Sequence, residues 1–197
     1  MRALLAILLL SLLAGCASAR LIDAQVQTST AGAAIEPGAR YRFERLPSQA
    51  GEPDRMEQIE AMARQALAQA GLVHDEAQAR YSVLLGTRSQ SYLADEWGRP
   101  LGGAGSGVYG SVMIGSGTGG GMFGWGMRFP APTHYHHEVS LLLRDLASGQ
   151  VVYETRAAHN GPWADAAHIL PALFDAALRD FPQPPAGTRQ VNVEIAR

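Results

Sequence analysis

The stretch HEVSLLLRDLASGQVVYETRAA, residues 137–158, has the pattern of a β-hairpin and organises the interpretation of this chain. Its two halves alternate apolar and polar side chains, and the turn between them contains Gly149. If Gly149 takes the left-handed position of a three-residue loop with a bulge, Leu143 lies opposite Tyr153. The apolar faces of the two strands then coincide, which predicts an antiparallel sheet packed on one side.

Two further segments have helical periodicity. In residues 54–70 apolar side chains recur every three or four positions, and Asp54 and Glu57 have the spacing of a capping box. Residues 163–181 repeat Ala, Leu and Phe at the same interval, and Pro171 predicts a kink or a restart within that helix.

Additional strands are expected where short segments alternate or contain several β-branched and aromatic residues. These segments are residues 21–28, 40–46, 81–85 and 191–195. Together with the hairpin and the two helices they predict an α+β fold, with a mainly antiparallel sheet and two helices.

One stretch departs from this regular patterning. Residues 98–126 contain 13 glycines in 29 residues, a composition typical of a long loop and unfavourable for a regular helix or strand. The segments on either side are too short to form separate cores. We therefore expect a single α+β domain over residues 21–197, with a glycine-rich insertion at 98–126.

The N-terminus has the features of an export signal. Residues 1–15 combine one Arg with an apolar run of about ten residues, too short to span a bilayer. Leu13-Ala14-Gly15-Cys16 resembles the bacterial lipobox, whose Cys receives a diacylglycerol and acyl chains such as palmitate. This predicts a signal peptide over 1–15, lipidation of Cys16 and a tether over 16–20. The alternative is ordinary cleavage near Ala17-Ser18-Ala19.

The residues around the predicted cleavage point also indicate location. Ala17 follows Cys16. In the sorting rule of enteric bacteria Asp at this position signals retention, so Ala17 indicates the outer membrane, with the domain facing the periplasm. Cys16 is the only Cys of the chain. A disulfide framework and a catalytic thiol are therefore excluded once Cys16 is acylated.

Composition excludes further classes. The 16 cationic residues are all Arg, so the Lys of a phosphate-binding loop and any Schiff-base Lys are absent. A formal net charge of -2 and an aromatic content of 7% argue against a nucleic-acid partner.

Histidines form the first candidate for chemistry. His134 and His136 share one face of an extended strand, while His137 lies on the other face opposite His159. Two pairs on opposite faces provide no third ligand for a tetrahedral metal. A polar strand end next to a loop explains the cluster without a metal, and we therefore predict no metal ligands and no cofactor. A weak zinc or copper site is the alternative.

Catalytic motifs are weak. Gly105-Ser106-Gly107-Val108-Tyr109-Gly110 has the glycine spacing of a dinucleotide site but lacks the flanking strand and helix. No serine of the glycine-rich stretch has the nucleophile-elbow spacing, and the carboxylates Asp145, Glu154, Asp165 and Asp175 are scattered. We therefore expect no catalytic residues.

The glycine-rich segment has the most distinctive functional composition. It intersperses large apolar side chains among glycines, as expected for adaptable contact with a partner or with the bilayer interface. The alternative is a linker whose aromatics fold back on the sheet. The apolar residues are Tyr109, Met113, Ile114, Met122, Phe123, Trp125, Met127 and Phe129.

Several short motifs carry a resemblance to a known family. They are Tyr41-Arg42-Phe43, Ile59 to Leu72, the glycine and aromatic segment ending near Trp125, Leu143-Arg144-Asp145 and Phe181-Pro182. In this order they resemble a family of bacterial envelope lipoproteins catalogued as a domain of unknown function (DUF4136). The resemblance implies fold and location and supplies no catalytic residue. Tyr153 stands where the family often has Trp, and the last strand is additional.

These observations favour an outer-membrane-anchored periplasmic lipoprotein that acts as a non-catalytic binding or assembly module of the cell envelope. Its expected partners are the membrane, through the lipid on Cys16, and an envelope protein. Two alternatives stay open: a metal-handling lipoprotein using His134, His136 and His137, and an enzyme whose site assembles from distant residues.

Overall fold

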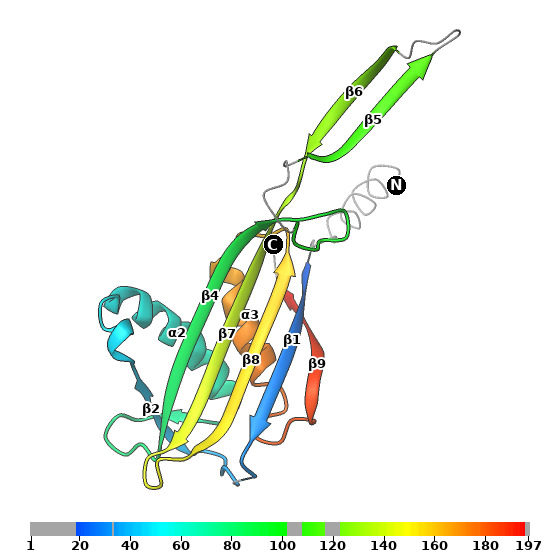
Figure 1. Ribbon diagram of the computed structural model, residues 1–197. Coiled ribbons are helices and arrows are strands. Elements are labelled where there is room, and N and C mark those ends of the chain that lie inside the picture. The colour runs from blue at the N-terminus through cyan, green and yellow to red at the C-terminus, as the bar shows by residue number, and fades with distance from the viewer. Residues whose placement is uncertain (1–18, 33, 102–107, 117–122, 196–197) are drawn as a thin grey trace, which may run out of the picture.

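The computed structural model describes residues 19–32, 34–101, 108–116 and 123–195, with side chains described outside 102–129. A seven-stranded sheet in the order β3-β2-β4-β7-β8-β1-β9 forms the body, and two further strands form a separate ribbon, β5-β6 (Figure 1). The predicted α+β class with a mostly antiparallel sheet and two α-helices is confirmed.

The centre of the sheet consists of β4 (Tyr81–Leu93), β7 (Thr133–Asp145) and β8 (Val151–Gly161), all antiparallel. Leu143 pairs with Tyr153, so the predicted register of the β7–β8 hairpin is confirmed. Gly149 adopts a left-handed φ of 73°. The predicted loop geometry is wrong, however, because the register shift lies beside Leu143, within the ladder, and the turn is held by the carboxylate of Asp145.

The first and last strands lie side by side. β1 (Arg20–Thr30) pairs antiparallel with β8 on one edge and with β9 (Gly187–Ile195) on the other. Gln25, for example, lies opposite both Ala158 and Gln190. The strand nearest the predicted lipid anchor is therefore an interior strand of the sheet.

The other edge of the sheet is parallel. β2 (Arg40–Glu44) pairs parallel with β4 and with the short β3 (Val73–His74), and a 3-10 turn, η1 (Pro47–Gln49), follows β2. The connection from β2 to β4 runs through α2 (Pro53–Gln69). A crossover helix is the usual means of joining parallel strands.

The predicted helix ends are corrected in part. α2 begins at Pro53, with Glu52 as N-cap, so Asp54 and Glu57 do not form the predicted capping box; Pro is well suited to the first helical position. α3 (Ala166–Ala177) continues through Pro171 without a restart, and a kink at that residue stays a prediction.

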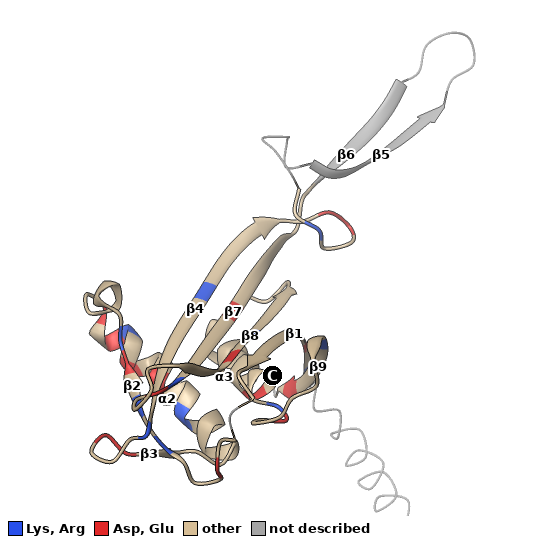
Figure 2. Ribbon diagram, turned by 60° about the horizontal axis from the view of Figure 1, so that its bottom comes forward, with Lys and Arg blue, Asp and Glu red and all other residues tan. Residues whose placement is uncertain are grey.

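Both helices cover the same face of the sheet, and the hydrophobic core lies between the layers (Figure 1). The predicted stripe of α2 is buried at Met56, Ile59, Ala63, Ala66 and Leu67. The opposite face of the sheet has no helix in the described part of the chain and carries many polar residues. Figure 2 shows the charged residues concentrated around α2, β2 and the loops at the β3 end of the sheet.

The glycine-rich insertion is not an irregular loop throughout, which corrects the prediction. β5 (Val108–Ser116) and β6 (Phe123–Pro130) pair antiparallel as a two-stranded ribbon. Glycine weakens a strand without forbidding it, and Val, Ile, Trp and Phe in alternate positions favour extended structure. The densest glycine runs, at 102–107 and 117–122, lie outside the described residues, as does Cys16 with the predicted signal peptide.

Among the described residues, no helix is both long and apolar enough to cross a membrane.

Candidate binding surface at the ribbon end of the sheet

The chain segments that are predicted to contact a membrane or a partner lie at the same end of the sheet. Leu93 at the end of β4 pairs with Thr133 at the start of β7, and the ribbon projects beyond this end (Figure 1). β8 ends here at Gly161, and β1 begins here at Arg20, because β1 runs antiparallel to β8. The first strand therefore starts at the base of the ribbon.

Large apolar side chains are exposed at this same end. Leu21 is 56% exposed, Leu93 is 45% exposed, Trp97 is 74% exposed and Leu101 is 38% exposed. These four are the majority of the seven exposed large hydrophobic residues in the part of the chain with described side chains. Their concentration at one end of the sheet indicates an interaction surface rather than scattered single residues.

Trp97 lies on a loop that hydrogen bonds to Asp95 hold in place. The carboxylate of Asp95 accepts hydrogen bonds from the backbone N–H groups of Trp97 (2.9 Å) and Arg99 (2.8 Å), and the Arg99 side chain donates to its second oxygen. Burial acts to raise the pKa of Asp95, but these hydrogen bonds outweigh it and the pKa lies below its usual value. Gly98 permits the turn with a φ of 76°.

The register of the ribbon pairs Ile114 with Trp125 and Met113 with Gly126. The apolar side chains that the glycine-rich segment contributes lie within residues 102–129, whose side chains are outside the described part of the structure.

The predicted surface histidines do share the open face of β7, but each has another partner. The Nδ1 atom of His136 lies 2.9 Å from the amide oxygen of Asn160, and its Nε2 lies 3.6 Å from a carboxylate oxygen of Glu138. His134 packs edge-on against Tyr92 with ring centroids 5.9 Å apart. The two rings are therefore engaged by different neighbours.

The other pair, His137 and His159, lies opposite each other on the helix-facing side, as the predicted register requires. Both are buried. His159 stacks on the ring of Trp163 at 5.9 Å, and its Nδ1 lies 2.7 Å from a carboxylate oxygen of Asp23. Within the described residues there is no group of three His, Cys, Asp or Glu side chains positioned to hold a metal ion.

His137 has a contact that sequence analysis missed. Its Nε2 lies 3.0 Å from the carbonyl oxygen of Trp163, and since a carbonyl only accepts, Nε2 carries the proton. Nδ1 is then free to accept from the hydroxyl of Ser89, 2.9 Å away. Burial lowers the pKa of His137, which favours this neutral form. Ser89 lies opposite His137 only through the long β4–β7 register, which no local motif indicates.

The four carboxylates considered as catalytic candidates lie in different parts of the domain. Asp145 holds the β7–β8 turn through the backbone N–H of Ser148, a bond that lowers the pKa of this carboxyl. Asp165 contacts His168 beside α3. Glu154 lies on the open sheet face, and Asp175 is half-buried near the ends of α2 and α3, where burial raises its pKa.

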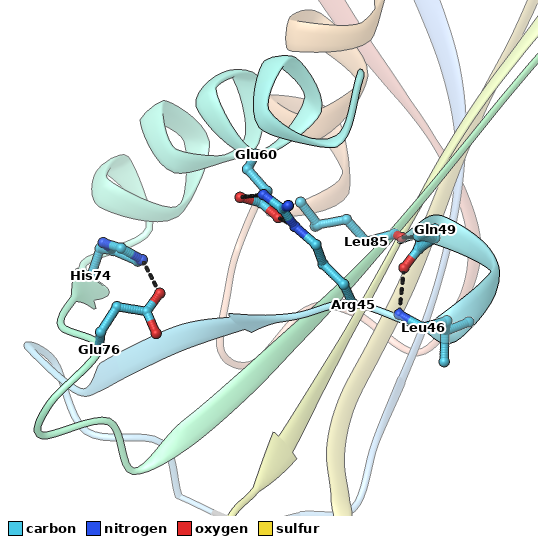
Figure 3. Close-up of polar contacts among 7 residues, drawn as sticks. All are labelled: Arg45, Leu46, Gln49, Glu60, His74, Glu76 and Leu85. Carbon is cyan, nitrogen blue, oxygen red and sulfur yellow. Dashed lines mark hydrogen bonds and ion pairs between the residues drawn. The ribbon is translucent and has the colours of Figure 1, made fainter. Parts of the chain in front are cut away.

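A second surface lies beside β2. The guanidinium of Arg45 donates to both carboxylate oxygens of Glu60 on α2, at 2.6 and 2.8 Å (Figure 3). Gln49 then bridges the backbone N–H of Leu46 and the carbonyl of Leu85. These contacts hold η1 over the sheet, beside a hollow of about 230 Å³ lined by Leu84, Gly86, Ser140 and Leu142 among others.

A mixed seven-stranded sheet with two helices on one face and a two-stranded ribbon between β4 and β7 defines the structural class of this domain. The chain belongs to the family described as "Domain of unknown function (DUF4136)", which matches residues 25–183. This confirms the family that the short motifs resemble. A comparison with curated protein sequences finds no significant match.

Solved structures show distant likenesses of backbone shape. A PDZ domain protein from Parabacteroides distasonis ATCC 8503 aligns at 13% identity and a TM-score of 0.49, over 90% of this chain and 39% of that one. The PelC dodecamer from Paraburkholderia phytofirmans aligns at 15% identity and a TM-score of 0.42, over 79% and 94% of the two chains. The chain thus spans well under half of the first structure.

Proposed function

We propose that this protein is a lipoprotein of the outer membrane, anchored through acylated Cys16 and facing the periplasm, that acts as a non-catalytic binding or assembly module of the cell envelope. The observation that carries the proposal is the place where the anchored segment joins the fold. β1 begins at Arg20, four residues after Cys16, at the sheet end that bears the ribbon and the exposed apolar side chains. Anchor and candidate surface are thus at one end of the domain.

The structure of the body supports a scaffold role. The core between helices and sheet is apolar, and the carboxylates and surface histidines are engaged in separate local contacts. Such an arrangement suits a stable domain that carries a binding surface, whereas a catalytic site needs polar groups that converge on one point.

Metabolic labelling with palmitate, followed by fractionation of the envelope, tests the anchor. We expect label on the unchanged protein, and loss of label and release from the membrane, or failure of cleavage, for Cys16→Ser. Ser18→Ala changes a small polar residue just outside the lipobox and is expected to leave labelling unchanged. Cleaved Cys16→Ser protein that still pellets with membranes would contradict the proposal.

The Ser89–His137 contact favours a second candidate function, because a hydroxyl hydrogen-bonded to an unprotonated imidazole nitrogen is part of a nucleophilic site. We assign it a structural role, since His137 is buried and both of its ring nitrogens are already paired. A fluorophosphonate probe should leave Ser89 unmodified. Labelling that is lost on Ser89→Ala would instead favour an enzyme.

A further inference from the structure

We propose that the free edge of β4, residues 86–92, binds an extended segment of a partner protein as an additional strand of the sheet. The segment carries apolar side chains with an acidic residue among them. This inference rests on the proposed function as a binding module, and it adds a second surface and the chemistry of its partner. It does not use the lipid anchor, so the two proposals can fail separately.

The outer edge of β4 is paired along only part of its length. β2 pairs with residues 81–84, whereas β7 pairs with residues 81–93 on the other side (Figure 1). In the part of the chain that the structure describes, residues 86–92 therefore have a neighbouring strand on one side only. This stretch, GTRSQSY, contains no Pro, and its register with β7 is continuous. Because Pro and bulges are common means of keeping an edge from pairing, this edge is open to another strand.

The direction of the backbone groups follows from two hydrogen bonds at the ends of the free edge. The carbonyl of Leu85 accepts from the side chain of Gln49, and the carbonyl of Leu93 accepts from a backbone N–H of the loop that follows β4. Both donors lie outside the β4–β7 ladder, so both carbonyls face away from β7. Backbone direction alternates along an antiparallel strand. The residues whose N–H and C=O groups face the free edge are therefore Thr87, Ser89 and Ser91.

A hollow lies on each side of the free edge. On the helix-facing side, apolar side chains of α2 and α3 and two hydroxyl residues of β4 line a hollow of about 250 Å³. On the open side lies the hollow of about 230 Å³ beside η1. Successive side chains of a strand point to opposite faces, so an added strand would reach both hollows. In β-strand addition, main-chain hydrogen bonds provide affinity and such pockets provide specificity. The helix-side lining includes Ile59, Met62, Leu170, Thr87 and Ser89.

The charges beside the free edge favour a partner segment over a second copy of this chain. Arg88 is exposed on the open face, and Glu138, opposite it on β7, contacts Arg156 at 3.6 Å instead. Arg55 lines the helix-side hollow. Two copies joined along this edge would bring their Arg88 side chains onto one strip of surface, where like charges repel. An Asp or Glu in a partner segment would instead pair with these cations.

Peptide display against the acylated full-length protein in detergent tests the inference. The probe is a library of random peptides about ten residues long, from which binders are selected and then synthesised. Ser91→Pro removes an N–H that faces the free edge and leaves the ladder to β7 in place, whereas Ser91→Ala keeps that N–H and is the matched control. We expect selected peptides to alternate apolar residues and to contain Asp or Glu. Their Kd should rise at least about tenfold for Ser91→Pro and stay nearly unchanged for Ser91→Ala.

Amide hydrogen exchange provides an independent measurement on the unchanged protein. The N–H groups of residues 87, 89 and 91 should exchange quickly without peptide and at least about tenfold more slowly with it. The N–H groups of the same stretch that face β7 should be slow in both states. Thr87→Pro repeats the substitution at a second position of the free edge. A Tm close to that of the unchanged protein shows that a Pro variant is folded, and exchange in the unchanged protein decides the question if neither variant folds.

Other outcomes overturn the inference. Peptides that bind Ser91→Pro as tightly as the unchanged protein, or that protect β9 instead of β4, would place the binding surface elsewhere. Protection of the free edge that needs no peptide and is lost on dilution would assign it to a second copy of the chain. Failure to select any peptide would show that the edge does not accept a strand. Cys16→Ser should bind the selected peptides as the unchanged protein does, so these results leave the test of the anchor separate.

Discussion

Replacing residues 102–129 by a flexible Gly-Ser linker a quarter as long should remove the ribbon without damaging the fold. The β4–β7 ladder already closes below this segment, where Leu93 pairs with Thr133 and the backbone N–H of Leu101 donates to the carbonyl of Leu93. Two halvings of loop length lower the entropic cost of closure by about 1.2 kcal/mol. Since 1 kcal/mol shifts Tm by about 2–4 °C in a domain of this size, we expect Tm to stay level or rise by a few degrees.

Thermal unfolding of the detergent-solubilised, acylated protein, followed by circular dichroism, makes the measurement. Unchanged or slightly raised stability is the expected result. A fall in Tm of more than about 10 °C would refute the reasoning, because it would mean that the ribbon contributes to the core.

Three further measurements examine the body of the domain. Arg45→Ala should lower Tm by several degrees, because it leaves the buried carboxylate of Glu60 unpaired, and the double change of Arg45 and Glu60 to Leu should recover much of the loss. The free energy of unfolding in urea should fall as pH drops below about 6.5, because burial lowers the pKa of His137 in the folded protein and the unfolded chain therefore binds more protons at this residue. His137 contributes at most about 1.4 kcal/mol per pH unit to this fall, and His137→Gln should reduce the slope. Zinc and copper titrated calorimetrically should bind no tighter than the micromolar range; a stoichiometric site abolished by His136→Ala would show that the metal alternative is correct.

The central hairpin and the helical faces were predictable because their information is local. Alternation over residues 137–158 determines which side chains meet, so the pairing of Leu143 with Tyr153 follows even though the bulge lies elsewhere. The apolar spacing in α2 likewise identifies its buried face, while the preference of Pro53 for the first helical turn decides where the helix begins.

Elements that depend on distant pairing were not predictable. β4 extends to Leu93 through a polar stretch without clear alternation, because β7 pairs with it along its whole length. The ribbon forms within a glycine-rich segment for a similar reason: its strands continue a hairpin already closed beneath them. The Ser89–His137 contact depends on that same register and therefore had no local signature.

The interior position of β1 has a mechanical consequence. A pull transmitted from the membrane through residues 16–20 acts along β1, whose hydrogen bonds to β8 and β9 lie across the direction of force. Both ladders then bear the load in shear, with many bonds stretched together instead of opened one after another as at a fraying edge. The strand that leads to the predicted anchor is thus joined to the domain in the geometry that resists extraction best. This resistance is complete only after β9, more than 150 residues later in the chain, has paired with β1.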